Sequence, residues 1–279
     1  MRLCKCLFIT WLAVFALFAS WHAVALQAES PALTFYAMGD VPYASAEDEL
    51  LPRQIAALPS DAAFVVHLGD IKKGSTPCNE AVYAKVAGML RKSSHRVFIV
   101  PGDNEWNDCQ DPDSSWAFWV KHFMRFDRHW ESPIKVSRQP DRQENFAFTY
   151  NRVLFIGINI VGGRVHDLAE WKQRHQQNIA WIDSQLKKQG EESSSLVLFG
   201  HAQPAVKHKD FFRPLSEIAR GYKKPVLYIH GDGHRWHKHT PFPAKNILCV
   251  QVDQGGIASP LKVTVGRDAK EPFTFDRRN

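Results

Sequence analysis

Short apolar runs that lead into Gly-Asp or Gly-His recur along the chain. Each run contains four to six β-branched, aromatic or aliphatic residues, which is typical of a strand buried on both faces. The five runs cover residues 34–38, 63–68, 97–100, 196–199 and 226–229. Each predicted strand therefore carries polar residues at its carboxyl end.

Amphipathic stretches between these runs predict helices. Ser45 and Asp48 have the spacing of a capping box, from which a helix is expected to extend to Leu58, with Pro52 as a defect near its start. Further helices are predicted over residues 79–92, 114–130 and 171–189. The alternation of strands and helices predicts an α/β fold with right-handed crossovers.

The second half of the chain also contains strands that no helix separates. Residues 146–150 and 153–158 flank Asn151-Arg152 and predict an antiparallel hairpin. More strands are predicted at residues 247–252, 261–265 and 273–275. The sheet is therefore expected to be mixed and arranged in two layers with helices outside. A single domain is predicted over residues 33–276.

The first 25 residues have the pattern of a secretory signal. Arg2 and Lys5 precede an apolar run from Leu7 to Ala19, and Ala23-Val24-Ala25 forms a small-residue cleavage site. The protein is therefore predicted to be periplasmic or secreted, with no stable membrane insertion after cleavage. An uncleaved anchor is the alternative, although the apolar run is shorter than the roughly 20 residues that span a bilayer.

Composition narrows the class of protein. The chain has 279 residues, of which 44% are hydrophobic, and no internal repeat, so disordered, fibrous and solenoid architectures are excluded. The net charge of the chain is +6. Removal of residues 1–25 would remove two basic residues and no acidic residue, so the net charge would become +4. No block of five basic residues occurs, so nucleic acid is not an expected partner.

Three cysteines lie outside the predicted signal. Cys78 and Cys109 each lie in a polar loop and are expected to form a disulfide, which a secretory compartment permits. Two unpaired loop thiols are the alternative. Cys249 lies in an apolar run over residues 246–252 and is predicted to be buried and free.

The strand ends supply several metal-ligating side chains. Ligands of α/β sheets bind where the carboxyl ends of strands converge, so these side chains are expected to share one crevice. They are Asp40, Asp70, Asp103, His201, Asp232 and His234. A single Gly-Asp after a strand is usually a turn, but carboxylates gathered this closely repel one another unless cations lie between them. Mixed oxygen and imidazole ligands indicate divalent ions such as Mn, Zn or Fe.

The order of these motifs resembles the calcineurin-like metallophosphoesterases. That family has the blocks Gly-Asp-x-His, Gly-Asp, Gly-Asn-His-Asp/Glu, a lone His, and Gly-His-x-His. The corresponding blocks here are Gly39-Asp40, Gly69-Asp70, Gly102-Asp103-Asn104-Glu105, Gly200-His201 and Gly231-Asp232-Gly233-His234. The resemblance extends from about Leu33 to Phe275. It is strongest to a bacterial subgroup marked by Gly-Asp-x-Pro-Tyr, at residues 39–43, and Pro-Gly-Asp-Asn-Glu-Trp, at residues 101–106.

The resemblance implies a two-layer mixed β sandwich flanked by helices and a centre of two divalent ions. Asp70 would bridge both ions, Asp40 and His234 would hold the first, and His201 would hold the second. The implied activity is hydrolysis of a phosphate mono- or diester of a small molecule by attack of a metal-bound hydroxide. Asp70, Asn104 and His201 are the expected catalytic residues.

Three departures from the family pattern fall on ligand positions. Pro42 replaces a histidine, Asp103-Asn104 replaces Asn-His, and Asp232 replaces a histidine. If Asp103 and Asp232 hold the second ion, the greater number of hard oxygen ligands favours Mn, Mg or Ca over Zn, with Fe also compatible. A shift of one residue would instead make Asn104 the ligand, and both arrangements stay open.

Asn104 also replaces the histidine that resembles a leaving-group acid in many relatives. An amide cannot donate a proton at a useful pKa, so either the leaving group is already acidic or another residue donates the proton. The alternative function is a catalytically impaired protein of the same fold that binds a metal or a phosphorylated ligand. His67 and His230, which directly precede Gly-Asp motifs or lie close to them, are expected to orient the carboxylates.

Overall fold

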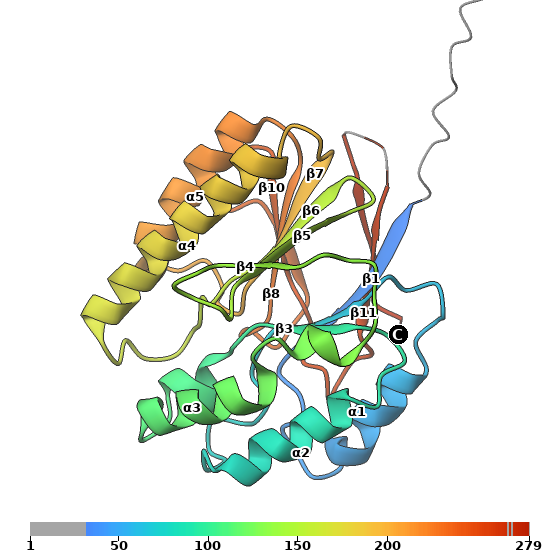
Figure 1. Ribbon diagram of the computed structural model, residues 1–279, viewed down its shortest axis with the longest axis vertical. Coiled ribbons are helices and arrows are strands. Elements are labelled where there is room, and N and C mark those ends of the chain that lie inside the picture. The colour runs from blue at the N-terminus through green and yellow to red at the C-terminus, as the bar shows by residue number, and fades with distance from the viewer. Residues whose placement is uncertain (1–31, 267, 269, 279) are drawn as a thin grey trace, which may run out of the picture. The chain divides into compact units, whose positions relative to one another are not determined.

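Two β-sheets pack face to face in the computed structural model, which describes residues 32–266, 268 and 270–278 (Figure 1). They belong to the unit Pro31–Asn279, and the predicted signal over residues 1–25 lies outside the described residues. The first sheet consists, in spatial order, of β12 (Phe273–Asp276), β11 (Leu261–Val265), β1 (Leu33–Met38), β2 (Val65–His67) and β3 (Val97–Ile99).

The second sheet is also mixed. Its spatial order is β4 (Ser137–Arg138), β5 (Phe146–Tyr150), β6 (Val153–Gly157), β7 (Ser195–Phe199), β8 (Val226–His230), β10 (Ile247–Gln251) and β9 (His237–His239). Strands β1, β2 and β3 run parallel in the first sheet, as do β6, β7, β8 and β10 in the second. The other pairs are antiparallel. Several carboxyl ends within each sheet therefore lie along one edge.

Phenylalanine rings fill the space between the sheets. Phe64 stacks on Phe35 at 5.1 Å between ring centroids and meets the edge of Phe155 at 5.0 Å. Phe35 and Phe155 are fully buried on opposite sheets. Burial of each such ring contributes about 1.5–3 kcal/mol, which makes this layer the main cohesive contact between the sheets.

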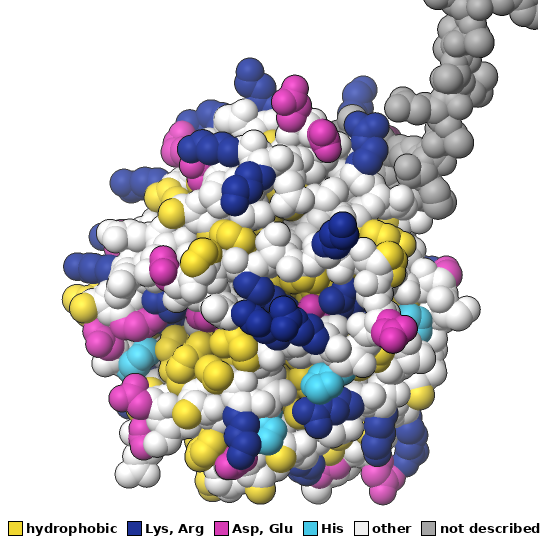
Figure 2. All heavy atoms as spheres, viewed as in Figure 1, with side chains coloured by type: hydrophobic (Ala, Val, Ile, Leu, Met, Phe, Trp, Pro, Cys, Tyr) yellow, Lys and Arg dark blue, Asp and Glu magenta, His cyan; other side chains and the backbone are white. Residues whose placement is uncertain are grey.

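Helices cover the outer faces of both sheets (Figure 1). The first sheet is covered by α1 (Glu47–Ala56), α2 (Glu80–Leu90) and α3 (Pro112–Phe123), and the second by α4 (Leu168–Gln189) and α5 (Lys209–Tyr222). The predicted two-layer mixed sandwich flanked by helices is thus confirmed. Among the described residues, no helix combines the length and apolar character needed to cross a membrane. Acidic and basic side chains are interspersed over the face in Figure 2.

Several predicted elements differ from the observed ones. The helix predicted over residues 114–130 ends at Phe123, and a short 3-10 turn follows at Phe126–His129. The predicted capping box at Ser45 is wrong, because Ala46 is the N-cap residue of α1 and makes no side-chain cap. The Glu47 carboxylate instead accepts a hydrogen bond from the backbone N–H of Tyr43 at 2.5 Å. Helix α5 and the short edge strands β4 and β9 were not predicted.

Cys78 and Cys109 form the predicted disulfide, and Cys249 is buried and free. Burial raises the pKa of the Cys249 thiol to about 12, so this cysteine is a neutral core residue. The disulfide joins positions 31 residues apart and ties the segment after β2 to the segment before α3.

Cys78→Ser is expected to lower the free energy of unfolding by about 3 kcal/mol under oxidising conditions, because the unfolded chain loses a cross-link across this loop. Urea unfolding of the variant and the wild type, each with and without reductant, measures this effect. In reductant the two proteins should have nearly equal stability. A variant that remains equally less stable than the wild type in reductant would contradict the cross-link as the cause.

A pair of buried histidines joins α4 to the segment before α5. His175 Nε2 and His208 Nδ1 lie 3.3 Å apart, and the His208 ring stacks on Trp171. Burial lowers the pKa of His175 to about 4 and that of His208 to about 3, with Arg174 and Lys207 adding to the effect. Both residues are therefore neutral in the folded protein near neutral pH.

These lowered pKa values predict a loss of stability in acid. Below the unfolded pKa of about 6.5 the unfolded chain binds protons that folded His175 and His208 exclude, so stability falls as the pH drops from about 6.5 towards 4. The expected loss is roughly 1–2 kcal/mol per histidine between pH 7 and pH 5. Urea unfolding at both pH values should show a smaller loss for His175→Gln than for the wild type. The exposed control His237→Gln should match the wild type, and an unchanged loss in His175→Gln would refute the assignment.

Candidate metal centre

Acidic residues and a histidine from five strands converge at one edge of the sandwich. Potential ligand atoms of Asp40, Asp70 and His201 lie within 4.8 Å of one another, and so do those of Asp103, His201 and Asp232. His201 belongs to both groups. These residues follow the carboxyl ends of β1, β2, β3, β7 and β8. Five of the residues singled out from the sequence are thus brought together in space.

The backbone at these strand ends has an uncommon conformation. Asp40, Asp70, Asp232 and His234 all have φ between 57° and 67°, in the left-handed region. Non-glycine residues adopt this region at some energetic cost, and such residues concentrate at functional sites. Three of these residues, Asp40, Asp70 and Asp232, belong to the two clusters of ligand atoms.

His201 is held in one orientation by the first sheet. Its Nδ1 donates to the backbone oxygen of Leu68 at 2.7 Å, which turns Nε2 towards Oδ1 of Asp70, at 3.4 Å, and Oδ1 of Asp103, at 3.1 Å. Asp40 Oδ2 is buried and has no hydrogen-bond partner among the described residues, whereas the buried atoms His201 Nε2 and Asp103 Oδ1 lie at ion-pair distance from each other. Buried polar atoms are rarely left unpaired, so this donor set fits a cation.

The electrostatics of the cluster favour a cation as well. Burial raises the pKa of Asp70 well above its usual value, and the carboxylates of Asp103, Glu105 and Asp40 add to the rise against the opposing charge of His201. Burial also raises the pKa of Asp232. Burial alone would lower the pKa of His201, but Asp70 and Asp103 together raise it. His201 relieves part of the repulsion between the carboxylates, since its contact outweighs burial and lowers the pKa of Asp103, and a metal ion would relieve more.

Asn104 and Tyr43 both contact the carboxylate of Asp70. Asn104 Nδ2 donates to Asp70 Oδ2 and, at 3.0 Å, to the hydroxyl oxygen of Tyr43. The Tyr43 hydroxyl in turn donates to Asp70 Oδ2 at 2.6 Å. Asp103 has a carboxylate oxygen in the cluster with His201, and the amide of the neighbouring Asn104 contacts Asp70. Tyr43 was not predicted as a site residue, and its only sequence signal is the last position of Gly-Asp-x-Pro-Tyr.

His234 lies at the rim of the centre. Its Nε2 is 3.4 Å from Asp40 Oδ1, and its side chain is 45% exposed. A hydrogen bond with Asp40 raises the pKa of His234. The structure therefore places His234 beside the first group but outside both close clusters.

Glu105 fixes the backbone beneath the carboxylates. Its Oε1 accepts from the N–H groups of Gly102, at 2.6 Å, and Asp70, at 3.3 Å. Glu105 belongs to a π-helix over Asp103–Asn107, which also buries Trp106 among Val161 and Trp171. The role of Glu105 was not predicted, because the two backbone contacts become visible only in three dimensions.

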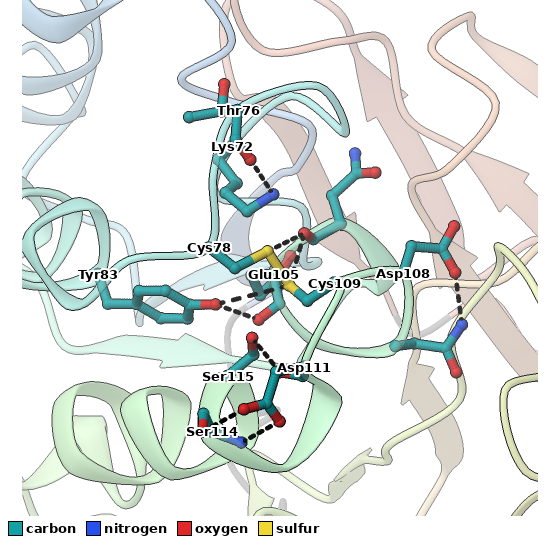
Figure 3. The surroundings of a disulfide bond; sticks show 12 residues. Lys72, Thr76, Cys78, Tyr83, Glu105, Asp108, Cys109, Asp111, Ser114 and Ser115 are labelled. Atoms are coloured by element: carbon teal, nitrogen blue, oxygen red, sulfur yellow. Dashed lines mark hydrogen bonds between the residues drawn. A yellow bond between two sulfur atoms is a disulfide. The ribbon is translucent and has the colours of Figure 1, made fainter.

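The disulfide lies beside this π-helix (Figure 3). Both sulfur atoms are close to the backbone oxygen of Asn104, at 3.6 Å from Cys78 and 3.5 Å from Cys109. The Tyr83 hydroxyl donates to the backbone oxygen of Glu105 at 2.5 Å. Lys72, shown in the same view, is buried and donates to the Thr76 backbone oxygen at 2.8 Å.

Gly162, in the loop between β6 and α4, lies against the centre on one side. A Cβ atom added to Gly162 would lie 2.7 Å from both Asp103 Oδ1 and Asp232 Oδ2. Asn159, at the start of this loop, is held by Asn145 Oδ1, which accepts from its N–H at 2.7 Å, and by Arg174, which donates to its Oδ1 at 3.1 Å. The close approach therefore depends on a buried polar network between α4 and the loop.

Two histidines have a different role from the one expected. His67 Nε2 lies 2.9 Å from the backbone oxygen of Val41, and His230 Nδ1 lies 2.8 Å from that of Gly231. They therefore bind the backbone of the strand-end turns, and the prediction that they contact the carboxylates directly is wrong. These contacts give hydrogen-bond partners to backbone oxygens that are buried in the strand-end turns.

Comparison with known proteins shows similarity in fold only. Neither a family model nor a curated protein matches the chain. Among solved structures, GAP50, described as the anchor in the inner membrane complex of Plasmodium, is 12% identical, with 89% of each chain covered and a TM-score of 0.54. A 5'-nucleotidase from Candida albicans is 14% identical, with a TM-score of 0.50 over 88% of this chain. The match spans about half of the nucleotidase, 51% of its length.

Proposed function

We propose that this protein is a metal-dependent phosphoesterase that hydrolyses a phosphate mono- or diester of a small molecule. The observation that carries the proposal is the convergence of four carboxylates on the buried His201, where Asp40 Oδ2 has no hydrogen-bond partner among the described residues. The fold shared with a 5'-nucleotidase is compatible with this activity but does not establish it.

The candidate ligands can be assigned to two metal positions. Asp70 would bridge two ions because its carboxylate lies beside both Asp40 and His201. Asp40 and His234 would complete the first position. The second position would use His201, Asp103 and Asp232, whose ligand atoms lie within 4.8 Å of one another. When bound, divalent cations supply Lewis acidity to the phosphoryl group and lower the pKa of water.

The surrounding residues keep the carboxylates in place. Tyr43 and Asn104 each donate a hydrogen bond to Asp70 Oδ2, which fixes the direction of its other oxygen. Asn104 N–H donates to that second oxygen at 3.0 Å. Asn104 therefore acts in this proposal by positioning Asp70, since an amide cannot serve as a general acid. Substrates with acidic leaving groups should consequently be preferred.

The ligand set also supports a choice of metal. Four carboxylates and two imidazoles offer more hard oxygen atoms than the histidine-rich sites typical of zinc. We therefore expect Mn²⁺, Mg²⁺ or Ca²⁺ to be preferred over Zn²⁺, with iron also compatible. The disulfide supports a periplasmic or secreted location, because disulfides persist mainly in oxidising compartments.

Hydrolysis of p-nitrophenyl phosphate and bis(p-nitrophenyl) phosphate by the purified, chelator-treated protein tests the proposal. These esters have acidic leaving groups and report mono- and diesterase activity separately. Activity should return with Mn²⁺ and fall at least 100-fold in Asp103→Asn, whereas the surface control Asp183→Asn should match the wild type. Protein that binds Mn²⁺ but hydrolyses neither ester would contradict the enzymatic proposal.

The alternative function is binding without turnover. Pro42 occupies a position where the resembled family has a ligand, and Asn104 occupies the position of its leaving-group acid. The similar fold of GAP50, which is described as an anchor, is compatible with a non-catalytic use of this architecture. Retained metal with no hydrolysis of either ester would favour this alternative.

A further inference from the structure

A separate pocket of about 450 Å³ lies at the end of the second sheet remote from the carboxylates. Its lining includes Val226 and Ile247, the first residues of the parallel strands β8 and β10, whereas Asp232 follows the last residue of β8. A strand of five residues spans roughly 15 Å, so the pocket and the metal centre are distinct sites. The volume falls within the range of small-molecule pockets.

Four lysines from separate segments line this pocket. They are Lys223, directly after α5; Lys238, in β9; Lys245, before β10; and Lys270, before β12. All four are exposed, and Glu271 is the single acidic residue of the lining. Within the described part of the chain none of the four is in an ion pair. Four ammonium groups and one carboxylate around one pocket therefore leave a net positive field.

The inner wall of the pocket is apolar and well anchored. Pro225, Leu248 and Pro272 contribute hydrophobic surface beside the lysines. Asn246 Nδ2 donates to the backbone oxygens of Ala219, at 2.7 Å, and Lys224, at 2.8 Å, which fixes the segment before β10. The pocket thus combines an apolar wall with exposed cationic side chains.

We propose that this pocket binds an organic polyphosphate, a small molecule that carries several phosphate groups on an apolar body. A multivalent anion relieves the repulsion between the lysines more effectively than a single charge, because the interactions add at short range. The apolar body would lie against Pro225 and Leu248. The site is independent of the metal centre and of the activity proposed for it.

Isothermal titration with ATP and with tripolyphosphate tests the proposal. The full chain is used in EDTA, so that no divalent ion can hold either probe at the metal centre. ATP is expected to bind with one site per chain, and its affinity should fall at least tenfold between 50 and 200 mM salt. Tripolyphosphate, which lacks the organic body, should bind more weakly than ATP.

Two triple variants that remove the same charge, one inside the pocket and one outside it, test whether ATP binds in this pocket. Lys223→Gln/Lys245→Gln/Lys270→Gln should weaken ATP binding at least tenfold, while phosphoesterase activity stays unchanged. Lys92→Gln/Lys135→Gln/Lys188→Gln removes the same charge from exposed positions outside the pocket and should leave binding unchanged. Absence of ATP binding, or equal weakening in both triple variants, would overturn the proposal. Equal affinity for ATP and tripolyphosphate would overturn the role of the apolar wall.

Discussion

Asp70→Asn is expected to abolish retention of divalent metal and to reduce any hydrolysis to background. Asp70 belongs to the first group of ligand atoms and lies 3.4 Å from His201, which belongs to both groups, and an amide supplies neither the charge nor the two equivalent oxygens of a carboxylate. Elemental analysis of the purified variant measures the metal, and hydrolysis of p-nitrophenyl phosphate measures the activity. Metal content equal to that of the wild type would refute the bridging role.

The stability of metal-free Asp70→Asn shows whether the variant has lost only the metal site or the fold as well. Burial and neighbouring carboxylates raise the pKa of Asp70, so a neutral amide relieves repulsion when metal is absent. Metal-free Asp70→Asn should therefore be at least as stable in urea as the metal-free wild type. A thermal shift on addition of Mn²⁺ should appear in the wild type only.

Gly162→Ala is expected to have the second largest effect. The new methyl group would lie 2.7 Å from Asp103 Oδ1 and from Asp232 Oδ2, so either the carboxylates leave their positions beside His201 or the loop moves away. We expect metal affinity and hydrolysis to fall about 100-fold, as measured by titration of Mn²⁺ into chelator-treated protein and by ester turnover.

Gly88→Ala is the matched control for this substitution. A Cβ atom at Gly88 meets nothing within 4 Å, and the residue lies inside α2. Alanine there should stabilise the protein by about 0.5–1 kcal/mol and leave metal binding unchanged. Wild-type affinity in Gly162→Ala would show that the loop can withdraw and that its close approach is not required.

The strands and their polar ends could be predicted because each run is apolar throughout and stops at Gly-Asp or Gly-His. The parallel arrangement then brings Asp40, Asp70 and Asp103 to one edge, as observed. The fold class is confirmed on this basis. Which residues act as metal ligands stays a prediction.

Helix α5 could not be recognised with the same ease, because Pro214 interrupts its pattern. Proline removes a helical hydrogen bond, yet the helix continues because Phe211, Leu215 and Ala219 are buried against the second sheet. Burial in the tertiary structure thus outweighs the local preference.

The contacts around the metal centre could not be predicted from the sequence for another reason. Tyr43, Glu105 and Gly162 act on residues that are distant along the chain, such as Asp70 and Asp103. No local period or spacing signals these contacts, since they depend on the paths of loops between the sheets.

The metal content of the purified chain tests the central claim most directly. The protein would be exposed to a mixture of Mn²⁺, Mg²⁺, Ca²⁺, Zn²⁺ and Fe²⁺, freed of loosely bound ions and measured by elemental analysis. We predict that one or two ions per chain are retained at the strand-end carboxylates, with Mn²⁺, Mg²⁺ or Ca²⁺ preferred over Zn²⁺. No retained ion, together with no thermal shift on addition of any metal, would contradict the account.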